Sequence, residues 1–203
     1  MLITDGTQLN NVDSMIDIET FSTEPNAVIL SIGAVLFDPY EQNTAAELGE
    51  YTFYENVTIE SQRHRHVSKD TQDWWKQQSK EAWDVLQYDQ LPLVKALERL
   101  YHFHMTRTGI KLPKVNRIWA NSPSFDCVIL DTAYRHYERF FNFPVPFWNW
   151  RDVRTIVDAA YLPGDDTRPV IRVGTHHNAL DDCISQALMV QDAHRILNRA
   201  YRK

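Results

Sequence analysis

Three stretches in the first third of the chain have the hydrophobic patterns of β-strands. Residues 10–20 (NNVDSMIDIET) lead towards a continuous apolar and β-branched run from Ile29 to Phe37, which ends at the turn signal Asp38-Pro39. Residues 49–59 (GEYTFYENVTI) alternate aromatic or β-branched residues with polar ones, the period-two pattern of a half-buried strand. We therefore expect three opening strands that are antiparallel to one another.

The rest of the chain changes mainly to helical spacing. A short strand is expected at residues 116–123 (NRIWANSP), where the chain runs into a turn. Apolar residues recur at helical spacing in five other segments: 68–87, 90–107, 125–140, 151–161 and 178–201. This order of strands and helices predicts a mixed α/β fold. No repeat or linker-like segment interrupts it, so we expect one domain over residues 1–203.

The composition is that of an ordinary globular protein. The chain has 203 residues, of which 43% are apolar, and this length suits one well-buried domain. No run reaches the ~18–20 consecutive apolar residues of a membrane helix. The start, MLITDGTQLN, has no basic segment followed by an apolar one, so we expect no secretion signal. Two cysteines are too few for a disulfide framework, which favours a reducing, cytoplasmic location.

The net charge of −6 disfavours a general polyanion-binding protein, which is usually basic. It does not exclude a nucleic-acid enzyme, because carboxylates that hold divalent cations lower the formal charge while the loaded site attracts phosphate. Basic residues are bunched in three places: Arg63–Lys69, Arg135 with His136 and Arg139, and Arg151 with Arg154. The simplest interpretation of each is a solvated face. The Arg63–Arg65 group is the candidate for contact with an approaching nucleic-acid strand.

Two carboxylates stand one residue apart inside the first predicted strand. Asp17 and Glu19 project to the same side, because residues i and i+2 of a strand share a face. Like charges held together cost free energy unless a cation lies between them, and carboxylate oxygens suit Mg²⁺ or Mn²⁺. The pair therefore indicates either a metal site or a polar strand edge that faces solvent.

A third carboxylate and a doubled His–Asp pair extend the candidate chemistry. Asp126 stands where the predicted short strand passes into a helix, a favoured place for ligand groups, although an aspartate in a first turn also complements the helix dipole. A lone histidine is more often structural than catalytic in a soluble protein. The stretch THHNALDDC contains two pairs with a separation of five: His176 with Asp181, and His177 with Asp182. Spacing alone chooses neither pair.

Taken in order, these motifs resemble the DEDDh (DnaQ-like) 3′–5′ exonuclease superfamily. The matching segments extend from residue 13 to about residue 195, and the last motif is the most specific. The tryptophans at 74–75 and the wording ANSPSFD are most similar to the phage and prophage branch, which includes exonucleases and exoribonucleases. The motif residues are DIET (Asp17, Glu19), ANSPSFD (Asp126) and HNALDD (His177, Asp182).

The resemblance implies a ribonuclease H-like fold with a mixed five-stranded sheet flanked by helices. It also implies hydrolysis from 3′ ends of single-stranded or 3′-overhang RNA or DNA, with release of nucleoside 5′-monophosphates. Two Mg²⁺ or Mn²⁺ ions about 3.5–4 Å apart can activate a water and stabilise the leaving 3′ oxygen. Asp17 would bridge the ions, Glu19 and Asp182 would complete the one that activates water, and Asp126 would support the other. His177 would accept the proton from the water.

The resemblance also favours the second register of the doubled pair. With His177 first, Ala179 falls two residues later, as in the pattern His-x-Ala-x-x-Asp, whereas the other register places Asn178 there. Asp181 has an ordinary explanation as well: if Asn178 caps the last helix, Asp181 lies in its first turn and complements the dipole. We therefore expect Asp182 to act with His177 and Asp181 to be structural.

Four residues beside the motifs are candidates for gripping the terminal nucleotide: Thr20, Phe21, Asn121 and Phe125. The two aromatic rings would stack on bases and the two polar side chains would bond the terminal sugar. For Trp75, Trp83 and Trp119, core packing is the favoured interpretation. The aromatic segment 140–150 is either a dimer interface or a loop folded over the sheet, so a homodimer stays an open alternative.

Three rival functions fit parts of the pattern. A non-catalytic nucleic-acid-binding module would show a gap in the catalytic set, and none of the five positions is missing. A ribonuclease H-type endonuclease of similar fold would lack the histidine of the last motif. A structural interaction protein would bind Mg²⁺ weakly or not at all. The choice between RNA and DNA stays open, because it depends on contacts to the 2′-hydroxyl that no motif specifies.

Overall fold

The computed structural model describes residues 12–105, 115–137, 142–161 and 167–201. Its strands form one mixed sheet in the order β4-β3-β2-β1-β5-β6. The strands are β1 (Asp13–Thr20), β2 (Ile29–Phe37), β3 (Thr52–Val57), β4 (Gln90–Leu91), β5 (Ile118–Ala120) and β6 (Trp150–Asp152). Strands β1, β2 and β3 are antiparallel neighbours, which confirms the predicted start of the chain. The later strands β5 and β6 add parallel to β1, beyond helical connections.

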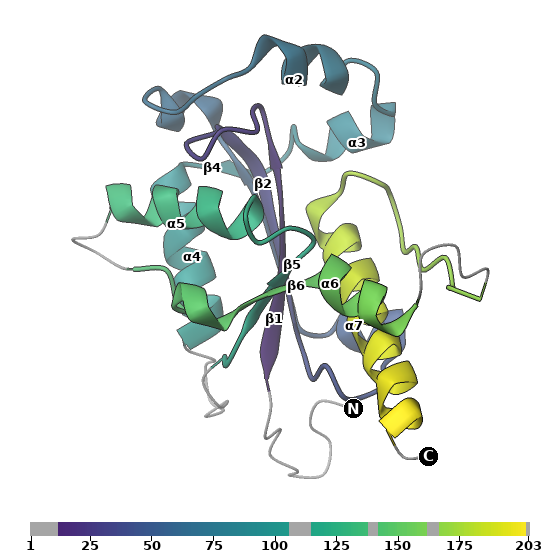
Figure 1. Cartoon of the computed structure of the whole chain (residues 1–203). Helices are drawn as coiled ribbons and strands as arrows, with labels where there is room; N and C mark the ends of the chain where they lie inside the picture. Colours follow the sequence, from purple (N-terminus) through teal and green to yellow (C-terminus); the bar gives the residue numbers. More distant parts are fainter. Residues whose placement is uncertain (1–11, 106–114, 138–141, 162–166, 202–203) are drawn as a thin grey trace.

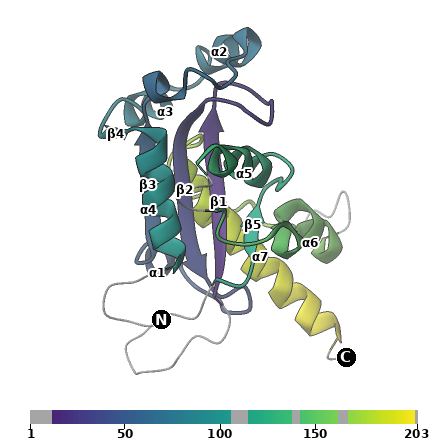
Figure 2. The same ribbon diagram turned by 90° about the vertical axis from the view of Figure 1, so that its left-hand side faces the viewer.

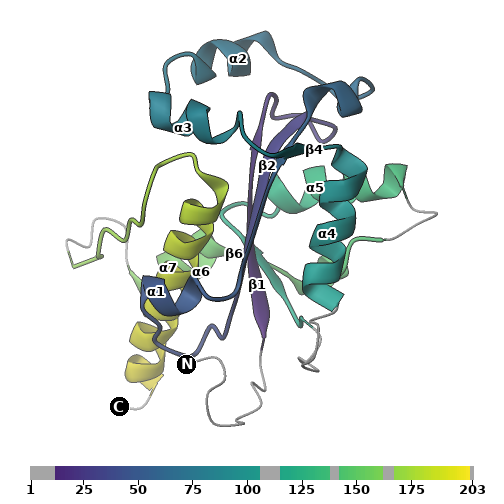
Figure 3. The same cartoon turned by 180° about the vertical axis from the view of Figure 1, so that it is seen from behind.

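Helices cover both faces of this sheet. They are α1 (Ala45–Leu48), α2 (Lys69–Trp75), α3 (Lys80–Val85), α4 (Leu93–Met105), α5 (Asp126–His136), α6 (Val153–Ala160) and α7 (Ala179–Tyr201), with short 3₁₀ turns η1 (Ile59–Gln62) and η2 (Phe147–Asn149). Helices α4 and α5 lie on one face, and α1, α6 and α7 lie on the other (Figures 1 and 3). Figure 2 shows α4 and α5 in front of the sheet. Within the described part of the chain, no helix has the length and apolar character needed to cross a bilayer.

The structure differs from the predicted elements at short features. The sheet has six strands, whereas the resemblance implies five and the sequence pattern marks four. The two unmarked strands, β4 and β6, have two and three residues and are too short to show a period-two pattern. The single helix expected over 68–87 is two helices, since Ser79 caps α3 by accepting a hydrogen bond from the Ala82 N–H. The predicted helix ends at 106–107 and 138–140, like Arg139, lie outside the described residues.

Strand β2 is the centre of the core. Every residue from Ile29 to Phe37 is buried, as expected for a continuous apolar strand covered on both faces. On one side Ile16 and Ile18 of β1 pack in a cluster with residues of α4 and α5. On the other side Met15 packs with residues of α6 and α7. Because side chains alternate along a strand, Asp17 and Glu19 share the side of Met15 and face α7.

A third apolar cluster closes the end of the sheet where β1 finishes. Helices α2 and α3 lie over this end (Figure 1). Trp75 of α2 is fully buried there with Phe21, and its indole N–H donates to the Thr20 carbonyl at 2.8 Å. The core position predicted for Trp75 is therefore confirmed, and α2 is held beside the carboxylates of β1.

Candidate active site

A cavity of about 450 Å³ opens where β1 and β5 end and where α5, α6 and α7 begin. Strand ends that pass into helices are a favoured position for ligand groups in α/β sheets. It is lined by Asp17, Ile18, Glu19, Asn121, Ser122, Phe125, Asp126, Arg154, Arg172, His176, His177, Asp182, Ser185, Gln186 and Met189. All five predicted catalytic residues are among them.

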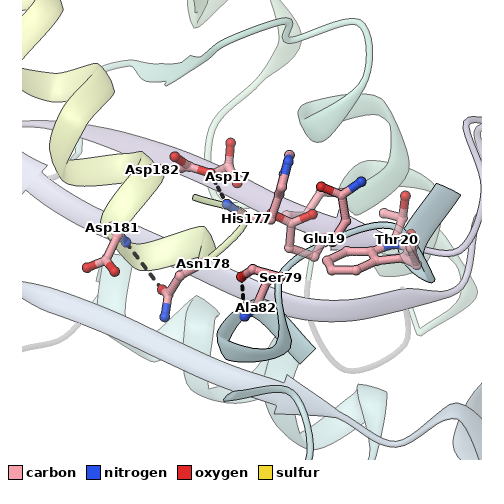
Figure 4. A network of polar contacts seen from close by, with 12 residues as sticks. Asp17, Glu19, Thr20, Ser79, Ala82, His177, Asn178, Asp181 and Asp182 are labelled. Carbon is pink, nitrogen blue, oxygen red and sulfur yellow. Dashed lines mark hydrogen bonds and ion pairs between the residues drawn. The ribbon is translucent and has the colours of Figure 1, made fainter. Parts of the chain in front are cut away.

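Three carboxylates from distant parts of the chain converge in this cavity. Asp17, Glu19 and Asp182 each offer an oxygen, and these oxygens lie within 4.8 Å of one another. Figure 4 shows Asp17 of β1 and Asp182 of α7 side by side. Asp126 lies outside this group of three; it is 4% exposed, and its Oδ1 accepts a hydrogen bond of 3.2 Å from the Ile18 N–H.

Burial and mutual repulsion make the ionised carboxylates unfavourable. Burial, followed by the charges of Asp126, Glu19 and Asp182, raises the pKa of Asp17 well above its ordinary value. Burial and its acidic neighbours raise the pKa of Glu19 to about 8, and burial raises the pKa of Asp126 to about 7. A divalent cation would offset this repulsion, and the clustered hard oxygen donors fit Mg²⁺ or Mn²⁺.

A glycine lets α7 approach β1 closely enough to form this cluster. Gly33 of β2 lies directly opposite Asp17 in the sheet. A Cβ atom at Gly33 would stand 2.4 Å from the carbonyl carbon and oxygen of Ala179, the first residue of α7. Asn178 caps α7 as predicted, because its Oδ1 accepts hydrogen bonds from Leu180 N at 3.0 Å and Asp181 N at 3.3 Å. The start of α7 therefore lies directly on the sheet.

Gln186 was not predicted from the sequence. Its side-chain nitrogen donates to Asp17 Oδ1 at 2.8 Å, and the residue is 6% exposed. It stands four residues after Asp182 on α7, so both side chains face the cavity. The four-residue spacing from Asp182 on a predicted helix is the sequence signal that could have indicated Gln186. Gln186 orients the carboxylate of Asp17, the residue expected to bridge the metal ions.

The backbone of His177 adopts the left-handed conformation, with φ of +63°. Its N–H donates to Asp182 Oδ2 at 3.1 Å, and its Nδ1 lies 3.8 Å from Glu19 Oε1. The imidazole is stacked on His176 at 3.9 Å and contacts the edge of Trp74 at 4.8 Å between ring centroids. Burial, and then the charge of His176, lowers the pKa of His177. A neutral imidazole held in this way can accept a proton.

Asp181 points away from the cavity, as Figure 4 shows. Its Oδ2 accepts a hydrogen bond of 2.8 Å from the Thr175 N–H. It also packs against Gly174, where φ is +59° and an added Cβ would stand 2.1 Å from Asp181 Oδ2. The structure thus brings His177 and Asp182 together in the cavity and leaves Asp181 to hold the loop that carries the histidines. This backbone contact is more specific than the dipole role expected from the sequence.

The predicted nucleotide-gripping residues divide into two groups. Asn121 and Phe125 line the cavity. Thr20 and Phe21 do not line it and are buried, at 6% and 7% exposure. Phe21 packs on Trp83 at 6.1 Å, because α2 and α3 cover the end of β1 and leave no ring face for a base. In this structure Phe21 is therefore a core residue.

The arginines were also only partly anticipated. Arg154 and Arg172 line the cavity, and Arg172 forms an ion pair with Asp182. Arg172 lies in a segment without regular structure, where no sequence pattern marks it. Arg65 of the basic group at 63–65 is instead buried and structural: its Nε donates to the Ala27 carbonyl at 2.7 Å. That residue is not available to a nucleic-acid strand.

Residues 12–194 match the family described as the 3′-5′ exoribonuclease Rv2179c-like domain. The chain is also similar to a protein of Enterobacteria phage T4 named exodeoxyribonuclease. The two are 29% identical over 204 residues, which cover 90% of this chain and 89% of the phage protein. These matches confirm the resemblance to 3′–5′ exonucleases that the motifs indicated.

Solved structures share the fold at low sequence identity. The E. coli exonuclease I in complex with a dA16 oligonucleotide superposes with a TM-score of 0.61 and 14% identity, covering 95% of this chain and 42% of that one. S. pombe Pop2p in its Mg²⁺- and Mn²⁺-bound form gives a TM-score of 0.54 and 16% identity, covering 88% and 81%. The chain thus spans less than half the length of exonuclease I. The likeness confirms the predicted ribonuclease H-like α/β fold.

Proposed function

The chain belongs to the 3′-5′ exoribonuclease Rv2179c-like domain family, and from this premise we propose that the cavity hydrolyses the terminal phosphodiester bond at 3′ ends of single-stranded or 3′-overhang nucleic acid. The product would be a nucleoside 5′-monophosphate. The observation that carries the proposal is the convergence of three carboxylates and one histidine in a single cavity: Asp17, Glu19, Asp182 and His177.

The carboxylates would hold two divalent ions. Asp17, Glu19 and Asp182 supply clustered oxygens for one ion, and Asp126 stands beside them for a second. When bound, Mg²⁺ or Mn²⁺ lowers the pKa of a water and stabilises the charge on the leaving oxygen. The raised pKa values of Asp17 and Glu19 support this assignment, because a bound cation would favour the ionised carboxylates that burial disfavours.

His177 would act as the general base. Its imidazole faces the cavity beside Glu19, and its lowered pKa keeps it unprotonated at neutral pH. Its position is set from three sides, by the Asp182 carboxylate on its N–H and by the rings of His176 and Trp74. Such fixed geometry matters because a base must lie within hydrogen-bonding reach of the proton that it removes.

The cavity also offers groups for the nucleotide itself. The ring of Phe125 is a candidate to stack on the terminal base, and Asn121 is a candidate to bond its sugar. Arg154 supplies positive charge towards the phosphate. The family description names exoribonuclease activity and the phage relative is named for DNA, so both nucleic acids are proposed substrates.

Two substitutions test the catalytic assignment. Asp17→Asn should abolish metal-dependent cleavage while the protein still folds, because one of the carboxylates that would hold the ions is lost. His177→Ala should lower kcat about 10²- to 10⁴-fold, the usual contribution of a general base, and His176→Ala should cost much less. Cleavage of 3′-labelled oligonucleotides with Mg²⁺ would measure this. Wild-type rates for His177→Ala would exclude it as the base, and wild-type rates for Asp17→Asn would exclude the metal-dependent proposal.

The substrate class needs a matched set of oligonucleotides. RNA and DNA of the same sequence, single-stranded and with a 3′ overhang on a duplex, would be compared with Mg²⁺ and with Mn²⁺. Shortening from the 3′ end one nucleotide at a time is the expected product pattern. Cleavage of a circular single strand would instead indicate an endonuclease and contradict the proposal.

A further inference from the structure

Arg172 stands at the metal-binding carboxylates without being part of the catalytic set. Its guanidinium Nη1 pairs with Asp182 Oδ1, and its side chain is 44% exposed, against 12% for Asp182. Among the described residues that line the cavity, Arg154 and Arg172 are the two with a fixed positive charge. Arg172 is therefore a cation placed on an oxygen of a carboxylate cluster that is suited to hold a metal ion.

The backbone beside Arg172 is anchored to α7. The N–H of Val173 donates to Ser185 Oγ at 2.9 Å, and the N–H of Thr175 donates to Asp181 Oδ2 at 2.8 Å. Ser185 in turn donates its hydroxyl to the Asp181 carbonyl at 2.8 Å. These bonds hold the segment against the first turns of α7, so Arg172 is kept within reach of the cavity by its local structure.

The two oxygens of Asp182 have different partners. Oδ2 accepts the His177 N–H at 3.1 Å, and Oδ1 is held by Arg172. A divalent ion bound by the cluster would use an oxygen of Asp182, the same carboxylate that the guanidinium binds. The two cations would therefore compete for it. The guanidinium side of this pair is 44% exposed, so it regains hydration when it leaves, and a bound divalent ion would replace its charge on the buried carboxylate.

We infer that Arg172 and a divalent ion compete for Asp182, and that the released guanidinium then binds a phosphate of the nucleic-acid strand. The second half rests on the proposed nuclease function. Arg172 also lines a neighbouring cavity of about 230 Å³ with Arg168, Val170 and Met189, so its side chain lies between the carboxylates and a second groove. The planar guanidinium suits two-point binding of phosphate oxygens. Arg172 would thus occupy an oxygen of Asp182 until a divalent ion binds, and would then position the substrate by its phosphate.

Metal binding tests the first half without any substrate. Mn²⁺ would be titrated by calorimetry into the full-length wild-type protein, Arg172→Gln and Arg168→Gln. Arg168 is the matched control, because it lies on the same segment, loses the same charge, and is 4.0 Å from Asp158 rather than near Asp182. Arg172→Gln should lower the Kd for Mn²⁺ about two- to fivefold, because the cation that competes for Asp182 is removed. Arg168→Gln should stay close to wild type.

Turnover on single-stranded oligonucleotides at saturating Mn²⁺ tests the second half. Arg172→Gln should lower kcat/KM at least about tenfold although it binds metal more tightly, and Arg172→Lys should recover part of the loss because a cation remains. Unchanged or weaker Mn²⁺ binding by Arg172→Gln would overturn the competition, and full activity would overturn the phosphate role. Absence of Mn²⁺ binding by the wild type would instead remove the proposed function, so the two failures are distinguishable.

Discussion

The contact between Gly33 and Ala179 decides how closely α7 approaches the carboxylates of β1. A methyl group at Gly33 would lie 2.4 Å from the Ala179 carbonyl, whereas ordinary contacts begin at 3.4 Å. The obstructing atoms are backbone, so no side-chain rotation relieves the clash. In Gly33→Ala, the start of α7 must therefore move away from the sheet by about 1 Å, the difference between these two distances.

This displacement has consequences for stability and for chemistry. Overpacking of this kind costs about 1–3 kcal/mol, which for a chain of this size lowers Tm by roughly 2–12 °C. Asp182 is carried on the same helix, three residues after Ala179, so it would move away from Asp17. A misplacement of about 1 Å can cost about 100-fold in rate. Gly33→Ala should thus fold, bind Mn²⁺ more weakly, and lose most of its nuclease activity.

Gly49→Ala is the matched control. Gly49 caps α1 with φ of −60°, and the atom closest to an added Cβ is the Ala46 carbonyl oxygen at 3.3 Å. This backbone conformation suits alanine, so the change should stay within about 1 kcal/mol of wild type. Thermal unfolding by circular dichroism, Mn²⁺ calorimetry and oligonucleotide cleavage would be compared for both variants. A Gly33→Ala protein with wild-type Tm and wild-type cleavage would refute the close approach of α7.

Two further predictions concern pH and the histidine loop. Glu19 has its pKa raised from 4.5 to about 8, so its protonation stabilises the fold fully below pH 4.5 and this contribution is lost as pH rises through 8. With divalent ions removed by EDTA, Tm should fall from pH 5 to pH 8 more in wild type than in Glu19→Gln; equal falls would contradict this. Asp181→Ala removes the acceptor of the Thr175 N–H and should lower kcat about tenfold while Mn²⁺ affinity stays within about twofold. A loss of Mn²⁺ binding as large as that of Asp182→Ala would show that Asp181 is a ligand.

Much of the fold could be predicted because the relevant signals are local. The continuous apolar run of β2 and the alternation along β3 are patterns of adjacent residues, and both strands formed where expected. The cap of α7 by Asn178 is also local, since it joins residues two and three positions apart. Strands β4 and β6 were missed, because two or three residues pair only when neighbouring strands are already in place.

The sequence predicted the site residues that belong to the motifs. It did not predict how the side chains around these motif residues are placed. Asp17 and Glu19 stand two apart on a strand, and their common face follows from strand geometry. Phe21 has the same spacing from Glu19, yet it is buried under α2 and α3, elements from a later part of the chain. Trp74 contacts His177 only through the folding of distant segments. Arg172 reaches Asp182, ten positions later, from a segment without regular structure that no pattern marks.

The stretch THHNALDDC illustrates the difference between what the sequence and what the tertiary structure determines. The sequence by itself determined the types of catalytic group, their order along the chain and the start of α7, because these depend on composition and short-range spacing. The resemblance favoured the register of His177 with Asp182, but only the tertiary structure brought these two residues to Glu19 and Asp17 and directed Asp181 to the Thr175 N–H. The physical reason is that α7 meets the sheet over Gly33 of β2, opposite Asp17, and this contact joins residues 146 positions apart (33 and 179), which no local pattern encodes.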